Sequence, residues 1–129
     1  MGLDFSHSEA SWSYSRFHQF RKRLFKETSN GLDLGKMEGF TRMFDDNNDE
    51  TPISFDEYNH DLRDFINHSD CEGELTPEQM KVIEPALRAQ VSSWGEDGDL
   101  MSLHHQIKAL QLCDGMIYAI SKNENMRFI

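Results

Sequence analysis

The sequence predicts a mainly α protein, folded as one compact domain (residues 1–129) of about four helices, with a small β pairing of the N- and C-terminal segments. Apolar residues recur at helical spacing in four stretches of the chain. Two of these stretches open with the S/T-x-x-E/Q spacing of a capping box. A chain of 129 residues, 37% of them hydrophobic, is long and apolar enough to bury one core.

The first helix is predicted over residues 14–28, where Phe17, Phe20 and Leu24 stand at i, i+3 and i+7. A basic group within it is expected either to form its solvated face or to face the acidic segment within the fold: Arg16, Arg21, Lys22, Arg23 and Lys26. The aromatic cluster at its start is expected to be core: Trp12, Tyr14, Phe17 and Phe20.

The second helix is predicted over residues 55–67, with Ser54 and Glu57 as its capping box. Between these two helices, residues 30–50 are expected to be mainly irregular. The second helix has an apolar stripe of five residues: Phe55, Tyr58, Leu62, Phe65 and Ile66.

The third helix is predicted to begin at Thr76-Pro77, with Thr76 as N-cap, Pro77 at the first helical position and Gln79 closing the box. Pro85 lies inside its apolar pattern and either kinks or restarts it.

The fourth helix covers roughly residues 99–121. Gly115 costs about 1 kcal/mol there relative to alanine, which indicates close packing against a neighbour. Its predicted apolar face has seven members: Leu100, Leu103, Ile107, Leu110, Met116, Ile117 and Ile120.

The two ends of the chain have an extended pattern. Leu3 and Phe5 alternate with polar residues, and residues 125–129 also favour a strand, so the two ends are expected to pair. The start of the chain lacks the pattern of a signal peptide, and no run of 18 apolar residues occurs. We therefore expect a cytoplasmic protein, away from membranes, with Cys71 and Cys113 as thiols.

The net charge of −10 is concentrated in one segment. Residues 44–80 contain one arginine against twelve Asp and Glu, whereas residues 1–43 and 81–129 are close to neutral. This segregation argues against direct nucleic-acid binding, which needs Lys and Arg to displace counterions from phosphates. It favours a basic protein surface or a cation as partner.

Two acidic loops in this segment match parts of the EF-hand calcium pattern. In residues 46–57, Thr51 stands where the sharp turn needs glycine. In residues 68–79, His68 and Gln79 replace the first and last carboxylates. The spacing between the loops is too short for a paired EF-hand domain. The candidate ligands are Asp46, Asn48, Glu50, Glu57, Asp70 and Glu72.

Other chemistry has less support in the sequence. The chain contains no G-x-S-x-G elbow, P-loop or H-E-x-x-H pattern. His68 with Cys71 is a half-motif for zinc or for a thiolate pair, without a second half. Adjacent His104 and His105 point about 100° apart on a helix and are expected to be solvated or partly packed.

Three stretches, taken together, resemble a family of small uncharacterised proteins from bacteria and their phages. The most specific is the loop His68-Ser69-Asp70-Cys71-Glu72-Gly73-Glu74-Leu75-Thr76-Pro77. The resemblance implies a bacterial or phage origin and a shared fold, but no activity, cofactor or catalytic residue. Residues 44–57 match it least. The other two stretches are Met1-Gly2-Leu3-Asp4-Phe5-Ser6-His7, with Trp12-Ser13-Tyr14 and Phe17–Arg21 after it, and Gly115-Met116 before the Phe-containing tail.

The sequence therefore predicts a small acidic interaction protein, non-enzymatic and without a cofactor, that binds a basic protein surface in a bacterial or phage-infected cell. By analogy with small acidic phage inhibitors and bacterial immunity proteins, a neutralising role is one form of this. The alternatives are a Ca²⁺-binding module and an enzyme with a site around His68, Asp70 and Cys71. The predicted interaction surface is Asp45, Asp46, Asp49, Asp70, Glu72 and Glu74.

Overall fold

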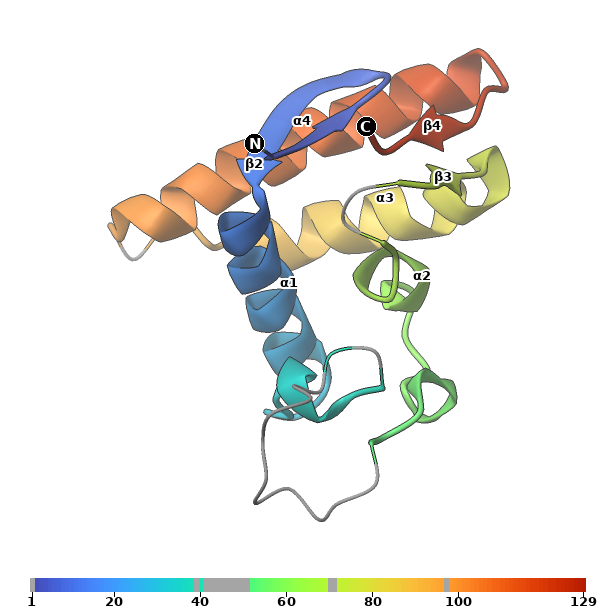
Figure 1. Ribbon diagram of the computed structural model, residues 1–129. Helices are drawn as coiled ribbons and strands as arrows, with labels where there is room; N and C mark the ends of the chain where they lie inside the picture. The colour runs from blue at the N-terminus through green and yellow to red at the C-terminus, as the bar shows by residue number, and fades with distance from the viewer. Residues whose placement is uncertain (1, 39, 41–51, 70–71, 97) are drawn as a thin grey trace.

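A computed structural model describes residues 2–38, 40, 52–69, 72–96 and 98–129 (Figure 1). The described residues form four α-helices and two small antiparallel strand pairs, which confirms the mainly α fold. Short 3-10 helices, labelled η, complete the fold. The elements are β1 (Gly2–Phe5), β2 (Ser8–Ser13), α1 (Tyr14–Thr28), η1 (Leu34–Lys36), η2 (Phe55–Glu57), α2 (Arg63–Ile66), β3 (Glu74–Leu75), α3 (Pro77–Val91), α4 (Leu100–Ser121) and β4 (Met126–Arg127).

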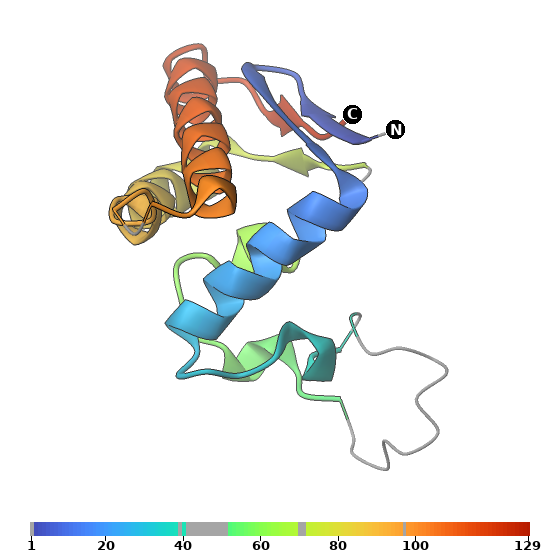
Figure 2. The same ribbon diagram turned by 90° about the vertical axis from the view of Figure 1, so that its left-hand side faces the viewer.

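The hairpin β1–β2 lies against α4, and α3 packs beside α4 (Figure 1). The two ends of the chain lie side by side (Figure 2). Asp4 and Ile129 exchange two backbone hydrogen bonds of 2.9 Å, and Phe5 and Phe128 form an antiparallel bridge. The predicted pairing of the termini is therefore confirmed.

The core is aromatic and is centred on the buried face of α1. The ring of Phe20 is fully buried and contacts five other rings. Trp12 stacks on it with centroids 4.9 Å apart, and Trp94 meets it edge to face at 5.7 Å. The predicted core assignment holds for Trp12, Phe17 and Phe20, whereas Tyr14 is exposed.

Helix capping sets the helix starts much as predicted. Thr76 and Gln79 form both halves of the capping box of α3, and this helix continues through Pro85 to Val91. Asp99 caps α4 by accepting a hydrogen bond from the Ser102 N–H. Ser54 does not form the expected box with Glu57, because its hydroxyl accepts the Asp56 N–H and caps a 3-10 turn.

The predicted helix over 55–67 is wrong as a single element. It is broken between η2 and α2, where the His60 side chain accepts the Leu62 N–H at 3.0 Å. A side chain that takes a backbone N–H in this way competes with the helix for it. Its apolar stripe is nevertheless buried as the sequence predicts: Phe55, Tyr58, Leu62, Phe65 and Ile66.

The predicted apolar face of α4 is right in part. Met116 is buried and Leu110 and Ile120 pack against the core, whereas Leu100, Leu103, Ile107 and Ile117 are exposed. The buried face consists mostly of smaller side chains, because the hairpin approaches α4 closely at Gly115. The buried residues are Ser102, His105, Ala109, Leu112, Cys113, Gly115, Met116 and Ala119.

Gly115→Ala is expected to destabilise the protein. An added Cβ would lie 2.6 Å from Ser8 Cβ and 2.7 Å from the His7 carbonyl oxygen, so the hairpin backbone must shift. Overpacking costs about 1–3 kcal/mol, which exceeds the gain in helix propensity of about 1 kcal/mol. Urea unfolding measures the difference, with Ser121→Ala as the control. Unchanged or increased stability would contradict the close packing of β2 on α4.

Stability is expected to fall at acid pH through His105. This ring accepts the Trp12 indole N–H at Nδ1 (3.3 Å), and burial lowers its pKa to about 4. The unfolded chain binds a proton below about pH 6.5, whereas the folded chain binds it only near pH 4. The free energy of unfolding should therefore drop between these values, by about 3 kcal/mol at most. His105→Gln keeps an acceptor for Trp12, and its stability should depend less steeply on pH. Identical slopes for the two proteins would exclude this role.

Candidate functional site

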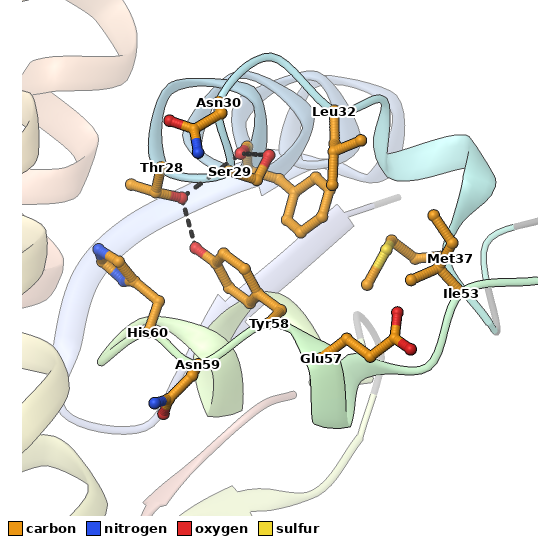
Figure 3. A pocket seen from close by; sticks show the side chains of 11 residues that line it. Thr28, Ser29, Asn30, Leu32, Met37, Ile53, Glu57, Tyr58, Asn59 and His60 are labelled. Atoms are coloured by element: carbon orange, nitrogen blue, oxygen red, sulfur yellow. Dashed lines mark hydrogen bonds between the residues drawn. The ribbon is translucent and has the colours of Figure 1, made fainter.

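A half-open pocket of about 440 Å³ lies between the C-terminal end of α1, η1 and the segment around η2 (Figure 3). Its size falls within the range of small-ligand sites. Phe25, Leu32, Met37 and Ile53 give it an apolar lining. The polar lining comes from Thr28, Ser29, Asn30, Glu57, Tyr58, Asn59 and His60.

A chain of hydrogen bonds joins the two walls of the pocket. Thr28 Oγ1 donates to the Leu24 carbonyl oxygen at 2.7 Å, so the Tyr58 hydroxyl donates to Thr28 Oγ1. Burial raises the pKa of Tyr58, which favours the neutral phenol that this bond requires. The His60 ring stacks on Tyr58 with centroids 5.6 Å apart. The wall formed by η2 is thereby fixed against α1.

The η2 side of the pocket is acidic, whereas the last turn of α1 on the other side contains Lys26. Among the described residues of its lining, Glu57 is the one carboxylate, and the C-terminal end of α1 adds the partial negative charge of a helix C-terminus. Residues 52–69 contain four exposed carboxylates against one arginine, Arg63, which lies 3.9 Å from one of them. These carboxylates belong to Asp56, Glu57, Asp61 and Asp64.

A buried arginine holds this acidic segment in place. Arg21 is 4% exposed, and its Nη1 donates to the carbonyl oxygens of Ile66 (3.2 Å) and His68 (2.7 Å). Its guanidinium also lies over the rings of Phe17 and Phe40, 4.8 and 4.9 Å from their centroids. The expectation of a solvated Arg21 is therefore wrong. It satisfies carbonyl groups at the end of α2 that this short helix cannot satisfy itself.

The described residues of the second acidic loop, 68–79, form contacts with the rest of the fold. The His68 ring nitrogens face the carbonyl oxygens of Ser69 (2.9 Å) and Glu74 (3.0 Å), and the ring packs on Phe128. The Gln79 side-chain oxygen accepts the Thr76 N–H of the capping box. The expected EF-hand positions of His68 and Gln79 are thus engaged in contacts within the protein.

The structure describes part of the predicted site residues. Glu57 lines the pocket, and Glu72 and Glu74 are exposed near the β3–β4 pair. Among the described residues, no three His, Cys, Asp or Glu side chains gather as a metal site. Outside the described residues lie Asp45, Asp46, Asn48, Asp49, Glu50, Asp70 and Cys71.

Cys113, the cysteine whose position the structure describes, has the environment of a structural residue. Cys113 is fully buried, and burial raises its pKa to about 12. A thiol held in this neutral form is a poor nucleophile. His105 is also buried in the core, although the sequence predicts that His104 and His105 are solvated or partly packed. His104 beside it is half-buried.

Sequence reasoning did not find the pocket. Its polar walls come from the Thr-Ser-Asn run that ends α1 and from the Tyr-Asn-His run that interrupts the predicted second helix. The polar residues at both places disfavour a helix, and this was the feature of the sequence that could have indicated the two walls of the pocket. Their proximity in space depends on the tertiary packing of η2 against α1.

Comparisons with known proteins returned no match: no family model, no curated protein and no solved structure corresponds to this chain. Within the described part of the chain, none of the helices has the length and apolar character needed to cross a membrane.

Arg21→Met is expected to destabilise the protein by about 2–4 kcal/mol, because it leaves the two carbonyl oxygens without their charged donor. Hydrogen exchange in the variant, compared with the wild type, should speed up more for the α2 amides than for the α3 amides. Lys22→Met, at an exposed neighbouring position, should change stability by less than about 0.5 kcal/mol. Equal effects of the two substitutions would contradict the anchoring role of Arg21.

Proposed function

We propose that the protein is a non-enzymatic interaction protein that binds a basic protein surface, with the pocket between α1 and η2 as its docking point. The observation that carries this proposal is the position of the pocket. Its carboxylate, Glu57, belongs to the acidic stretch 52–69 and lies beside an apolar lining that comes mainly from residues 25–37.

A lysine or arginine side chain is the ligand that fits this chemistry best. Both have an apolar stem and a cationic end, and they bury the stem while the charge stays near water or a carboxylate. The rings of Phe25 and Tyr58 can contact the stem, and Glu57 can pair with the charge. The neighbouring carboxylates would attract a basic surface before contact and speed association.

The two acidic loops predicted from the sequence extend the proposed surface. Glu72 and Glu74 are exposed. The surface predicted from the sequence also contains Asp45, Asp46, Asp49 and Asp70, which precede them in the same central segment. A surface of this charge suits a protein that covers and neutralises a basic site on another protein, as an inhibitor or immunity protein does.

Binding of a defined basic peptide tests the proposal. A fluorescein-labelled twelve-residue peptide of alternating arginine and alanine should bind, and raising the salt from 50 to 200 mM should weaken the binding. The same peptide with glutamine in place of arginine should not bind. Glu57→Gln should weaken binding about threefold, as expected for one partly exposed ion pair. Charge reversal at Asp46, Asp49, Asp70 and Glu72 together should abolish it.

Glu124→Gln is the matched control. It removes one exposed carboxylate beyond the C-terminal end of α4, far from the pocket (Figure 1). Equal effects of Glu57→Gln and Glu124→Gln would show that only the overall charge matters, and would exclude the pocket as the docking point. A calcium titration of the same protein tests the alternative in which Glu57 closes the 46–57 loop.

A further inference from the structure

The turn that ends α1 contains the one Asn-Gly pair in the sequence, Asn30-Gly31. Both residues are exposed and both have positive φ angles, 60° for Asn30 and 91° for Gly31. The Gly31 N–H donates to the Lys26 carbonyl oxygen at 2.9 Å, which makes this turn a Schellman motif with asparagine in the left-handed position. Asn30 also lines the pocket of the candidate site.

The end of α4 is built in the same way and provides an internal comparison. Asn123 has a φ of 54°, and the Glu124 N–H donates to the Ala119 carbonyl oxygen at 3.0 Å. Both Asn123 and Glu124 are exposed. The two turns share this hydrogen bond and the left-handed asparagine. They differ in the residue that follows the asparagine, which is glycine after α1 and glutamate after α4.

The side chain of an asparagine reacts slowly with the backbone nitrogen of the next residue. At this turn the Gly31 nitrogen attacks Asn30 Cγ, the bond from Cγ to Nδ2 breaks, and ammonia leaves with the proton of the Gly31 N–H. The five-membered succinimide that results takes up one water at either carbonyl and opens to aspartate or isoaspartate. Water is the only reagent. Glycine favours the attack because it has no Cβ to hinder it.

The folded turn slows this reaction, so its rate depends on local opening. The Gly31 nitrogen must leave its hydrogen bond to α1 and turn toward the Asn30 side chain. Helix ends open at a much lower free energy than the core does. Gly31 eases this opening, since it adopts many backbone conformations and a Cβ added to it would meet nothing within 4 Å. The turn at Glu124 instead leads into β4, where the Arg127 carbonyl oxygen accepts the Ser6 N–H at 3.0 Å.

We propose that Asn30 is a site of spontaneous deamidation, and that this modification regulates the pocket between α1 and η2. Asn30 lies on the α1 wall of the pocket, and Glu57 lies on the η2 wall (Figure 3). Conversion of the Asn30 amide to a carboxylate therefore gives the pocket an acidic group on each wall. A lysine or arginine side chain that enters between them is attracted by both. The regulation rests on the proposed function of the pocket, whereas the reaction itself does not.

Peptide mapping by mass spectrometry tests the reaction on the folded protein. After several weeks at mildly alkaline pH, the tryptic peptide that contains Asn30 should have gained the mass difference between an amide and an acid. Deamidation should be at least about tenfold faster at Asn30 than at Asn123, because glycine leaves the attack open and glutamate hinders it. Asn30→Gln should abolish the modification of this peptide, since glutamine would have to close a larger ring. A rate at Asn30 no higher than the rate at Asn123 overturns the proposal.

Binding of the arginine–alanine peptide tests the consequence for the pocket. Asn30→Asp imitates the deamidated product and should strengthen binding about threefold, as expected for one exposed ion pair. Asn123→Asp is the matched control, because it adds the same charge in the same type of turn, at the end of α4 and away from the pocket (Figure 1). Equal effects of the two substitutions would overturn the regulation. A wild type that does not bind the peptide would refute the proposed function and the regulation with it, while the mass spectra alone decide whether Asn30 deamidates.

Discussion

One turn of α1 holds the molecule together. Phe20 and Arg21 are adjacent in sequence and both buried, and they face different parts of the fold. The Phe20 ring meets side chains from β2, α2, α4 and the turn after α3, so it fixes the helices and the hairpin relative to one another. The Arg21 guanidinium reaches the carbonyl oxygens at the end of α2 and fixes the acidic segment. The orientation of this turn therefore determines both the core and the candidate site.

The acidic segment depends on this anchor because it has little regular structure of its own. Its described elements are η2 and α2, of three and four residues, too short to be stable alone. Four carboxylates near one arginine also repel one another in any compact arrangement. Burial of Phe55, Tyr58, Leu62, Phe65 and Ile66 beneath them opposes that repulsion. The segment thus presents negative charge on a surface whose underside is part of the core.

Local signals made the limits of α1, α3 and α4 predictable, and tertiary contacts explain what the sequence did not reveal. The ends of α1 and the start of α3 follow from capping side chains and apolar spacing, which act within a few residues. The burial of Arg21 depends on carbonyls more than forty residues away. The pocket likewise depends on Tyr58 meeting Thr28 across the fold. For α4, periodicity identified an apolar row correctly but could not show which side the hairpin would cover. Gly115 was the local clue, since only a small residue admits the hairpin backbone there.

The distribution of side chain sizes on α4 follows from the close approach of the hairpin at Gly115. The hairpin packs on the side of α4 that contains Gly115. Several branched aliphatic side chains of α4 point outward, so the helix is apolar on more than one side. A helix of that kind is usually enclosed on all its apolar sides.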